Sequence, residues 1–282
     1  MPIKNFNQEI IGVFQVLNKF DEYFTPDDED LLIAIASSAG ISLENAQLFE
    51  RQRKLLEEQK VVLDSFIETL ATSIDARDKI TSGHSSRVKM YSSLIAQEFG
   101  MEKNDLYILE KAAALHDIGK IGIRDSVLQK EGKLTPEEYK HIQQHVEITH
   151  HILEKIHMSE DFKQITEIAC SHHEKFDGTG YYRHLKGEEI PFGGRILAVS
   201  DVFDAITSKR HYRDKMPIEK VIDIIKNGAG SHFDPLVVDK FLDIKLSKIV
   251  GVFITENHMV IDKEDLVTLE TVSYTHLTLP TT

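Results

Sequence analysis

The chain has 282 residues, a hydrophobic fraction of 41% and a formal net charge of −13 at pH 7, which allows one large domain or two smaller ones with a packed core. Its acidic balance argues against nucleic acid polymers as partners, and its single cysteine, Cys170, excludes an internal disulfide framework and is expected to be buried. It has neither an apolar run of the roughly 20 residues that span a membrane nor a basic-then-apolar leader, so we expect a cytoplasmic location and no membrane partner.

The first 50 residues are expected to mix strand and helix. The run Ile10–Leu17 is rich in β-branched and aromatic residues and predicts a strand. Thr25 and Pro26, followed by acidic residues, are typical of the N-terminal cap and first turn of a helix.

One long helix is predicted over residues 41–70. Apolar residues recur there every seven positions in two series: Ile41, Leu48, Leu55 and Val62, and Phe49, Leu56, Leu63 and Leu70. Charged residues fill the intervals, so the pattern favours a two-stranded coiled coil between two copies of the chain. The alternative is an amphipathic helix that lies on its own domain.

Residues 71–250 have an almost entirely helical pattern, broken by short glycine-containing turns. The segment "FDGTGYYRHLKGEEIPFGG" is too long for a plain connection, and long loops in compact domains are usually functional. Residues 251–282 are interpreted as a C-terminal extension that ends in a loose tail.

Histidine and aspartate are concentrated in two short stretches. "CSHHEKFDGTG" contains the adjacent pair His172 and His173, and "LHDIGK" places His116 and Asp117 at the end of an apolar helix that Gly119 is expected to close. Burial of a carboxylate is costly unless it is paired or bound to a metal. The alternative is an aspartate that a nearby lysine or the backbone satisfies.

Three further candidate ligands, His84, His145 and Asp201, lie on segments with an apolar helical face. Imidazole and carboxylate together suit iron, manganese or zinc. The full set exceeds the three or four protein ligands of a mononuclear site, and two-metal sites typically hydrolyse phosphoesters. The remaining histidines His141, His150 and His151 are interpreted as surface or packing residues.

The stretches "HDIGKIGIRD", "HHEKFDGTGY" and "RILAVSDVFDAITSKRHYR" resemble the HD-GYP family of bacterial cyclic di-GMP phosphodiesterases, a branch of the HD hydrolase superfamily. The resemblance covers roughly residues 65–240. It implies a mainly α fold: a helical HD-type phosphohydrolase bundle over 71–250, preceded by a helical linker at 51–70. Residues 1–50 resemble the C-terminal part of an α/β GAF sensor domain.

The resemblance also implies roles for individual residues. The implied metal ligands, with Asp117 bridging two divalent ions, iron or manganese, are His84, His116, Asp117, His145, His172, His173 and Asp201. The implied catalytic residues are His116, Asp117 and Lys120. The implied substrate contacts are Lys120, which would hold a phosphate, together with Gly180, Tyr181, Asp204, Arg210 and Arg213. Without the resemblance, Arg210 and Arg213 read as a solvated helix end.

The implied reaction is hydrolysis of cyclic di-GMP to pGpG, and by further cleavage to GMP, through a metal-activated hydroxide at a binuclear site. Two departures bear on this. The sequence Gly180-Tyr181-Tyr182 stands where the family has Gly-Tyr-Pro, so the loop is expected to be looser. Ile80 stands where some members have a carboxylate for a third metal, so two metals are expected.

The alternatives are a non-catalytic cyclic di-GMP receptor that signals through partner proteins, and an HD hydrolase for another cyclic dinucleotide.

Overall fold

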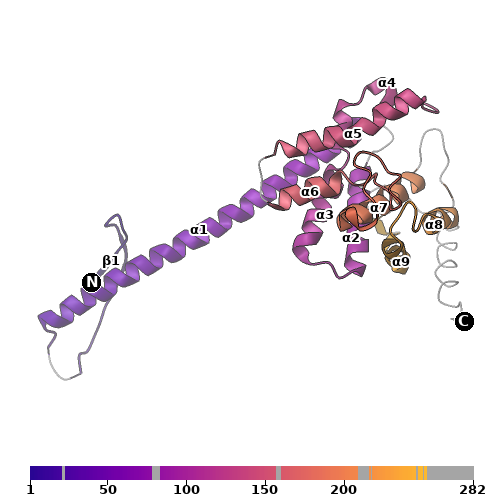
Figure 1. The fold of residues 1–282 in the computed structure, drawn as a ribbon. Coiled ribbons are helices and arrows are strands. Elements are labelled where there is room, and N and C mark those ends of the chain that lie inside the picture. The colour runs from indigo at the N-terminus through magenta and orange to yellow at the C-terminus, as the bar shows by residue number, and fades with distance from the viewer. Residues whose placement is uncertain are drawn as a thin grey trace, which may run out of the picture. The chain divides into compact units, whose positions relative to one another are not determined.

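Figure 1 shows a computed structural model of the chain, which describes residues 1–20, 23–77, 83–156, 160–208, 216, 218–245, 247–249 and 251–252. The chain divides into two compact units, Met1–Ser65 and Phe66–Thr282. The predicted tail beyond residue 252 lies outside the described residues.

The first unit contains a small antiparallel sheet. Strand β1 (Pro2–Lys4) pairs with β2 (Ile10–Val13), with Pro2 opposite Val13 and Ile3 opposite Gly12. The predicted strand to Leu17 was therefore too long, because the pairing partner has only three residues.

Helix α1 begins at Pro26, as predicted, and runs without a break to Arg77. Its first turn is capped reciprocally, since the Thr25 backbone N–H donates to the Asp28 carboxylate at 2.7 Å and the Asp28 N–H donates to the Thr25 hydroxyl at 3.4 Å. The helix interior has no proline, and its residues are mostly good helix formers.

Six of the eight heptad residues of α1 face solvent, and Leu63 and Leu70 are half-buried. Leu48, Leu55 and Val62 are 58%, 51% and 68% exposed. One 18-residue window of α1 also has the length and hydropathy, 1.3, of a membrane span and is 11% buried. One helix of this kind is weak evidence for a span, because core helices and signal sequences meet the same criterion.

The second unit is a bundle of helices (Figure 1). Its elements after α1 are α2 (His84–Glu98), α3 (Lys103–Leu115), the 3₁₀ turn η1 (Ile118–Gly122), α4 (Asp125–Leu128), α5 (Pro136–Glu154), α6 (Glu160–Ala169), the 3₁₀ turn η2 (Gly187–Glu189), α7 (Phe192–Thr207), α8 (Ile218–Asn227) and α9 (Pro235–Asp243). Helix α2 packs against α3, α7 and α9, α6 packs against α3 and α7, and α5 packs against η1. The predicted, mainly α, fold class is confirmed.

The core of this bundle lies between α2, α7 and α9. Tyr91 meets Phe203 edge to face, and Phe203 meets Phe241, each pair with ring centroids 5.0 Å apart. All three rings are fully buried, and each such ring removes a large apolar area from water. This packing fixes α7 against α2, which places polar residues of both helices beside one another.

Candidate metal centre

Seven polar side chains from separate parts of the bundle converge. They are His84 at the start of α2, His116 and Asp117 between α3 and η1, His145 on α5, His172 and His173 after α6, and Asp201 on α7. These are the seven residues predicted as metal ligands, so the structure brings the whole predicted set together.

The seven side chains form two groups with Asp117 between them. In one group, a ring nitrogen from each of His145, His172 and His173 lies within 4.8 Å of the others. In the other group, a ring nitrogen of His84, one of His116 and a carboxylate oxygen of Asp201 lie within the same distance of one another. The Asp117 oxygen Oδ1 lies 3.4 Å from Nε2 of His145, whereas Oδ2 lies 3.4 Å from Nε2 of His116 and 3.7 Å from Nε2 of His84. One carboxylate oxygen therefore faces each group, as a bridging ligand requires.

Three of the imidazoles are oriented in the same way by the backbone. His116, His145 and His172 each donate through Nδ1 to the carbonyl three residues earlier, at 2.6, 2.7 and 2.6 Å. A carbonyl can only accept, so Nδ1 carries the ring proton. In the neutral ring Nε2 then carries a lone pair, which points into the space between the seven side chains.

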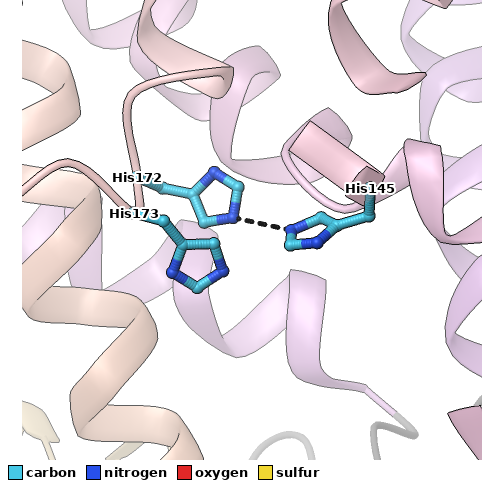
Figure 2. Close-up of side chains that lie close together, drawn as sticks. All are labelled: His145, His172 and His173. Atoms are coloured by element: carbon cyan, nitrogen blue, oxygen red, sulfur yellow. Dashed lines mark hydrogen bonds between the residues drawn. The ribbon is translucent and has the colours of Figure 1, made fainter. Parts of the chain in front are cut away.

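Figure 2 shows the close approach of His145 and His172, whose Nε2 atoms are 3.3 Å apart, with His173 beside them. Burial lowers the pKa of both His145 and His172, the latter well below its usual value, so both rings are neutral near pH 7. Two facing lone pairs repel unless they share a cation. In addition, Nε2 of His116 is buried with no hydrogen-bond partner among the described residues. Both observations fit metal ligands.

The ring of His84 is oriented by a carboxylate. Its Nδ1 lies 2.8 Å from Oδ2 of Asp204, and Asp204 is held in turn by Arg87, whose Nε and Nη2 donate at 2.6 and 3.0 Å. Burial disfavours the charged form of His84, but its hydrogen bonds to Asp201 and Asp204 outweigh this and raise its pKa to about 10. A carboxylate that orients a metal-binding histidine is a common second layer of a metal site.

This arrangement bears on the role predicted for Asp204. The residue is 1% exposed and both its oxygens are engaged by His84 and Arg87, which argues against direct contact with a substrate and favours positioning of His84. Arg87 was missed by sequence reasoning. The available signal was an arginine that shares the buried face of α2 with Val88 and Tyr91.

Asp117 also meets Lys120, whose Nζ lies 2.7 Å from Oδ2. Burial disfavours the charged carboxylate, but the positive charge of Lys120 outweighs this and holds the pKa of Asp117 well below its usual range. The alternative interpretation, an aspartate satisfied by a lysine, therefore holds for Oδ2 only. The other oxygen, Oδ1, faces His145.

Close packing holds the turn that carries these residues. A Cβ atom on Gly119 would lie 1.9 Å from the carbonyl oxygen of His145, so only glycine lets η1 approach α5 here. The hydroxyl of Thr149 accepts from the Gly119 N–H at 2.9 Å and donates to the His116 carbonyl at 3.1 Å. The predicted role of Gly119 as a helix C-cap was wrong: α3 ends at Leu115, and Gly119 lies inside η1.

The glycine-rich loop is attached to the centre through Tyr181, whose ring stacks on His173 at 4.7 Å. Burial lowers the pKa of His173 to about 3. Buried Glu174 accepts from the backbone N–H groups of Arg183 and Leu185 at 2.8 and 3.1 Å. A Cβ atom on Gly180 would lie 2.5 Å from the Glu174 Cα. The close approach explains why glycine stands at 180, and its predicted substrate contact stays a prediction.

Tyr182 has a φ of 95°. Proline is fixed near −65° and cannot adopt this conformation. The loop therefore follows a path that the family's proline would not allow. Two hydrogen bonds to Glu174 hold this path, and the expected loosening stays a prediction. Arg210 and Arg213, predicted to contact substrate, and Ile80 lie outside the described residues.

A family model described as HD domain matches residues 68–237.

The chain belongs to the HD domain family.

Among curated proteins, this HD domain chain is 35% identical over 240 residues to a 3′3′-cGAMP-specific phosphodiesterase 2 of Vibrio cholerae, an alignment that covers 84% of this chain and 44% of the relative. It is 40% identical to the 3′3′-cGAMP-specific phosphodiesterase 3 of that organism, over 61% of this chain and 38% of the relative. It is 42% identical to a cyclic di-GMP phosphodiesterase of Thermotoga maritima, over 64% of this chain and 48% of the relative. The chain thus spans less than half the length of each of these relatives.

Proposed function

We propose that this HD domain is a metal-dependent phosphodiesterase of the HD-GYP type that hydrolyses cyclic di-GMP to pGpG and, by further cleavage, to GMP. The observation that carries the proposal is the position of Asp117, with one carboxylate oxygen facing each of two histidine groups. The relatives named as phosphodiesterases of cyclic dinucleotides support the substrate class.

Two divalent cations, iron or manganese, would be held by the seven converging side chains. When bound, such ions lower the pKa of a water toward neutrality and stabilise negative charge on a phosphoryl group. The donor set of five imidazoles and two carboxylates fits these ions better than calcium or magnesium.

The chain's own residues would prepare the site for this chemistry. The neutral rings of His145, His172 and His173 present lone pairs without first releasing a proton near pH 7. Lys120 contacts Asp117 through one oxygen and its side chain is 15% exposed, so its ammonium group could turn to a phosphate oxygen of a bound substrate. A lysine placed in this way stabilises phosphoryl charge.

A second candidate substrate is 3′3′-cGAMP. It is favoured by one observation: two of the relatives are named as specific for that molecule, at 35% and 40% identity. The two dinucleotides share their phosphodiester ring and differ in one base, so the same metal centre would serve either.

The test is turnover by protein purified without oxygen and loaded with iron or manganese. Cyclic di-GMP and 3′3′-cGAMP are supplied separately at equal concentration, and products are separated chromatographically. We expect linear dinucleotide from cyclic di-GMP, with loss of both turnover and bound metal in the His116→Ala, Asp117→Ala double variant. Tight binding without product would favour a receptor, and full turnover by the metal-free variant would exclude the metal-dependent mechanism.

The assembly around the domain is also a proposal. We propose that the protein is a cytoplasmic homodimer joined through residues 41–70. Residues 1–50 would be the C-terminal part of a GAF sensor domain, and signalling proteins would be further partners. The exposed apolar series of α1 supports the dimer.

A further inference from the structure

A second group of histidines and carboxylates lies at the C-terminal end of α5. His150, His151 and Glu154 each offer one ligand atom, and these atoms lie within 4.8 Å of one another. None of the three belongs to the buried metal centre. We propose that they bind a divalent transition-metal cation at the surface of the HD domain.

The spacing on the helix suits a chelate. His150 and Glu154 are four residues apart and share one face, with Nδ1 of His150 3.9 Å from Oε2 of Glu154. His151 and Glu147 form a second such pair, with Nε2 4.0 Å from Oε1. These distances are too long for hydrogen bonds. Two ligands that each lie about 2.1 Å from one tetrahedral zinc ion are about 3.4 Å apart, so a small rotation of these side chains would bring either pair to a shared cation.

The surroundings favour a positive ion. The last carbonyl groups of a helix carry partial negative charge, and two carboxylates, Glu147 and Glu154, flank the imidazoles. The side chains of His151 and Glu154 are 64% and 67% exposed, so a cation reaches them without the cost of burying a charge. Imidazole ligands select zinc, nickel, copper or iron over calcium and magnesium.

The site is linked to the glycine-rich loop through one ring contact. The His150 ring lies 5.9 Å from the ring of Tyr182, and the neighbouring Tyr181 stacks on His173 of the buried centre. A cation that fixes the His150 ring would therefore restrict Tyr182 and, through the loop, the position of Tyr181.

The test uses the full chain and zinc alone. The buried centre is saturated first, and the further zinc bound per chain is then measured against free zinc by equilibrium dialysis. We expect wild type to bind one more, weaker, zinc ion. The affinity for this ion should fall at least about tenfold in Glu154→Gln, since even an outer-layer partner of a metal site is worth that much. The ion should be lost altogether in the double variant His151→Ala, Glu154→Gln.

The matched control is His141→Ala, which removes a histidine of the same helix that contacts Arg124 and Gln144 rather than the group. It should bind zinc like wild type. Identical zinc binding by wild type and the double variant would overturn the proposal. Slower amide hydrogen exchange of residues 180–185 on binding of the weaker ion, in wild type alone, is the expected sign of the link to the loop, and its absence would overturn that link. No readout depends on catalytic activity.

Discussion

At the scale of single residues, the seven converging side chains could be predicted because each lies in a short motif with its own apolar context. The ion pair of Arg87 and Asp204 could not be predicted in this way, because its members are 117 residues apart and only the packing of α2 on α7 joins them. For the same reason the motif could not indicate that Asp204 contacts His84, and its predicted substrate contact stays a prediction.

Replacement of Arg87 tests this second layer. In Arg87→Lys the two-pronged contact to Asp204 is lost, so His84 should be held less firmly. We expect the affinity of the metal centre to fall about 10- to 100-fold in competition with a chelator. The control Lys89→Met removes the neighbouring surface pair with Glu68 and should leave the affinity unchanged. Equal affinities in Arg87→Lys and wild type would remove Arg87 from the metal centre.

The pKa shifts predict an optimum of stability for the metal-free protein. His173 has a folded pKa of about 3 against an ordinary value of 6.5, so between these values only the unfolded chain is protonated and stability rises with pH. His84 has a folded pKa of about 10, so its contribution is complete below pH 6.5 and is lost as pH rises to 10. Urea unfolding with a chelator present should thus show greatest stability near pH 6.5. The decline in stability above pH 6.5 should be smaller in His84→Gln. A stability of the wild-type protein that rises steadily to pH 10 would show that the pKa of His84 is not raised.

At the scale of elements, the start of α1 and its helical stretch over residues 41–70 were predictable because a helix cap and a seven-residue period are local signals. The single helix is longer than that stretch and runs from Pro26 to Arg77. The length of strand β2 was overestimated because the length of a paired strand depends on its partner, and β1 has only three residues. The path of the loop after Gly180 depends on Glu174, which binds backbone N–H groups 9 and 11 residues further on. No local spacing records that contact.

The loop path predicts the order of stability among variants at Tyr182. Glycine adopts a φ of 95° without strain, alanine does not, and proline cannot reach it. We therefore expect Tyr182→Gly to be more stable than Tyr182→Ala by about 1 kcal/mol, and Tyr182→Pro to be the least stable, as measured by denaturant unfolding. A proline variant as stable as wild type would mean that the loop follows the family's path instead.

At the scale of the whole molecule, the proposed homodimer depends on the exposed apolar series of α1. The double variant Leu48→Lys, Leu55→Lys would place two charges per chain in the proposed apolar contact between the two α1 helices. Sedimentation of this variant should therefore show a monomer. The control Glu57→Lys changes a charged residue outside both apolar series and should stay dimeric. A monomeric wild-type protein at micromolar concentration would contradict the proposed assembly.

Metal content per chain shows whether Asp117 joins two metal ions. The measurement is made on protein purified without oxygen and carrying His151→Ala, Glu154→Gln, so that the proposed surface site does not contribute. We expect two tightly bound ions per chain, and the loss of this pair when Asp117 is replaced by alanine. One ion per chain, or two ions that persist in Asp117→Ala, would contradict it.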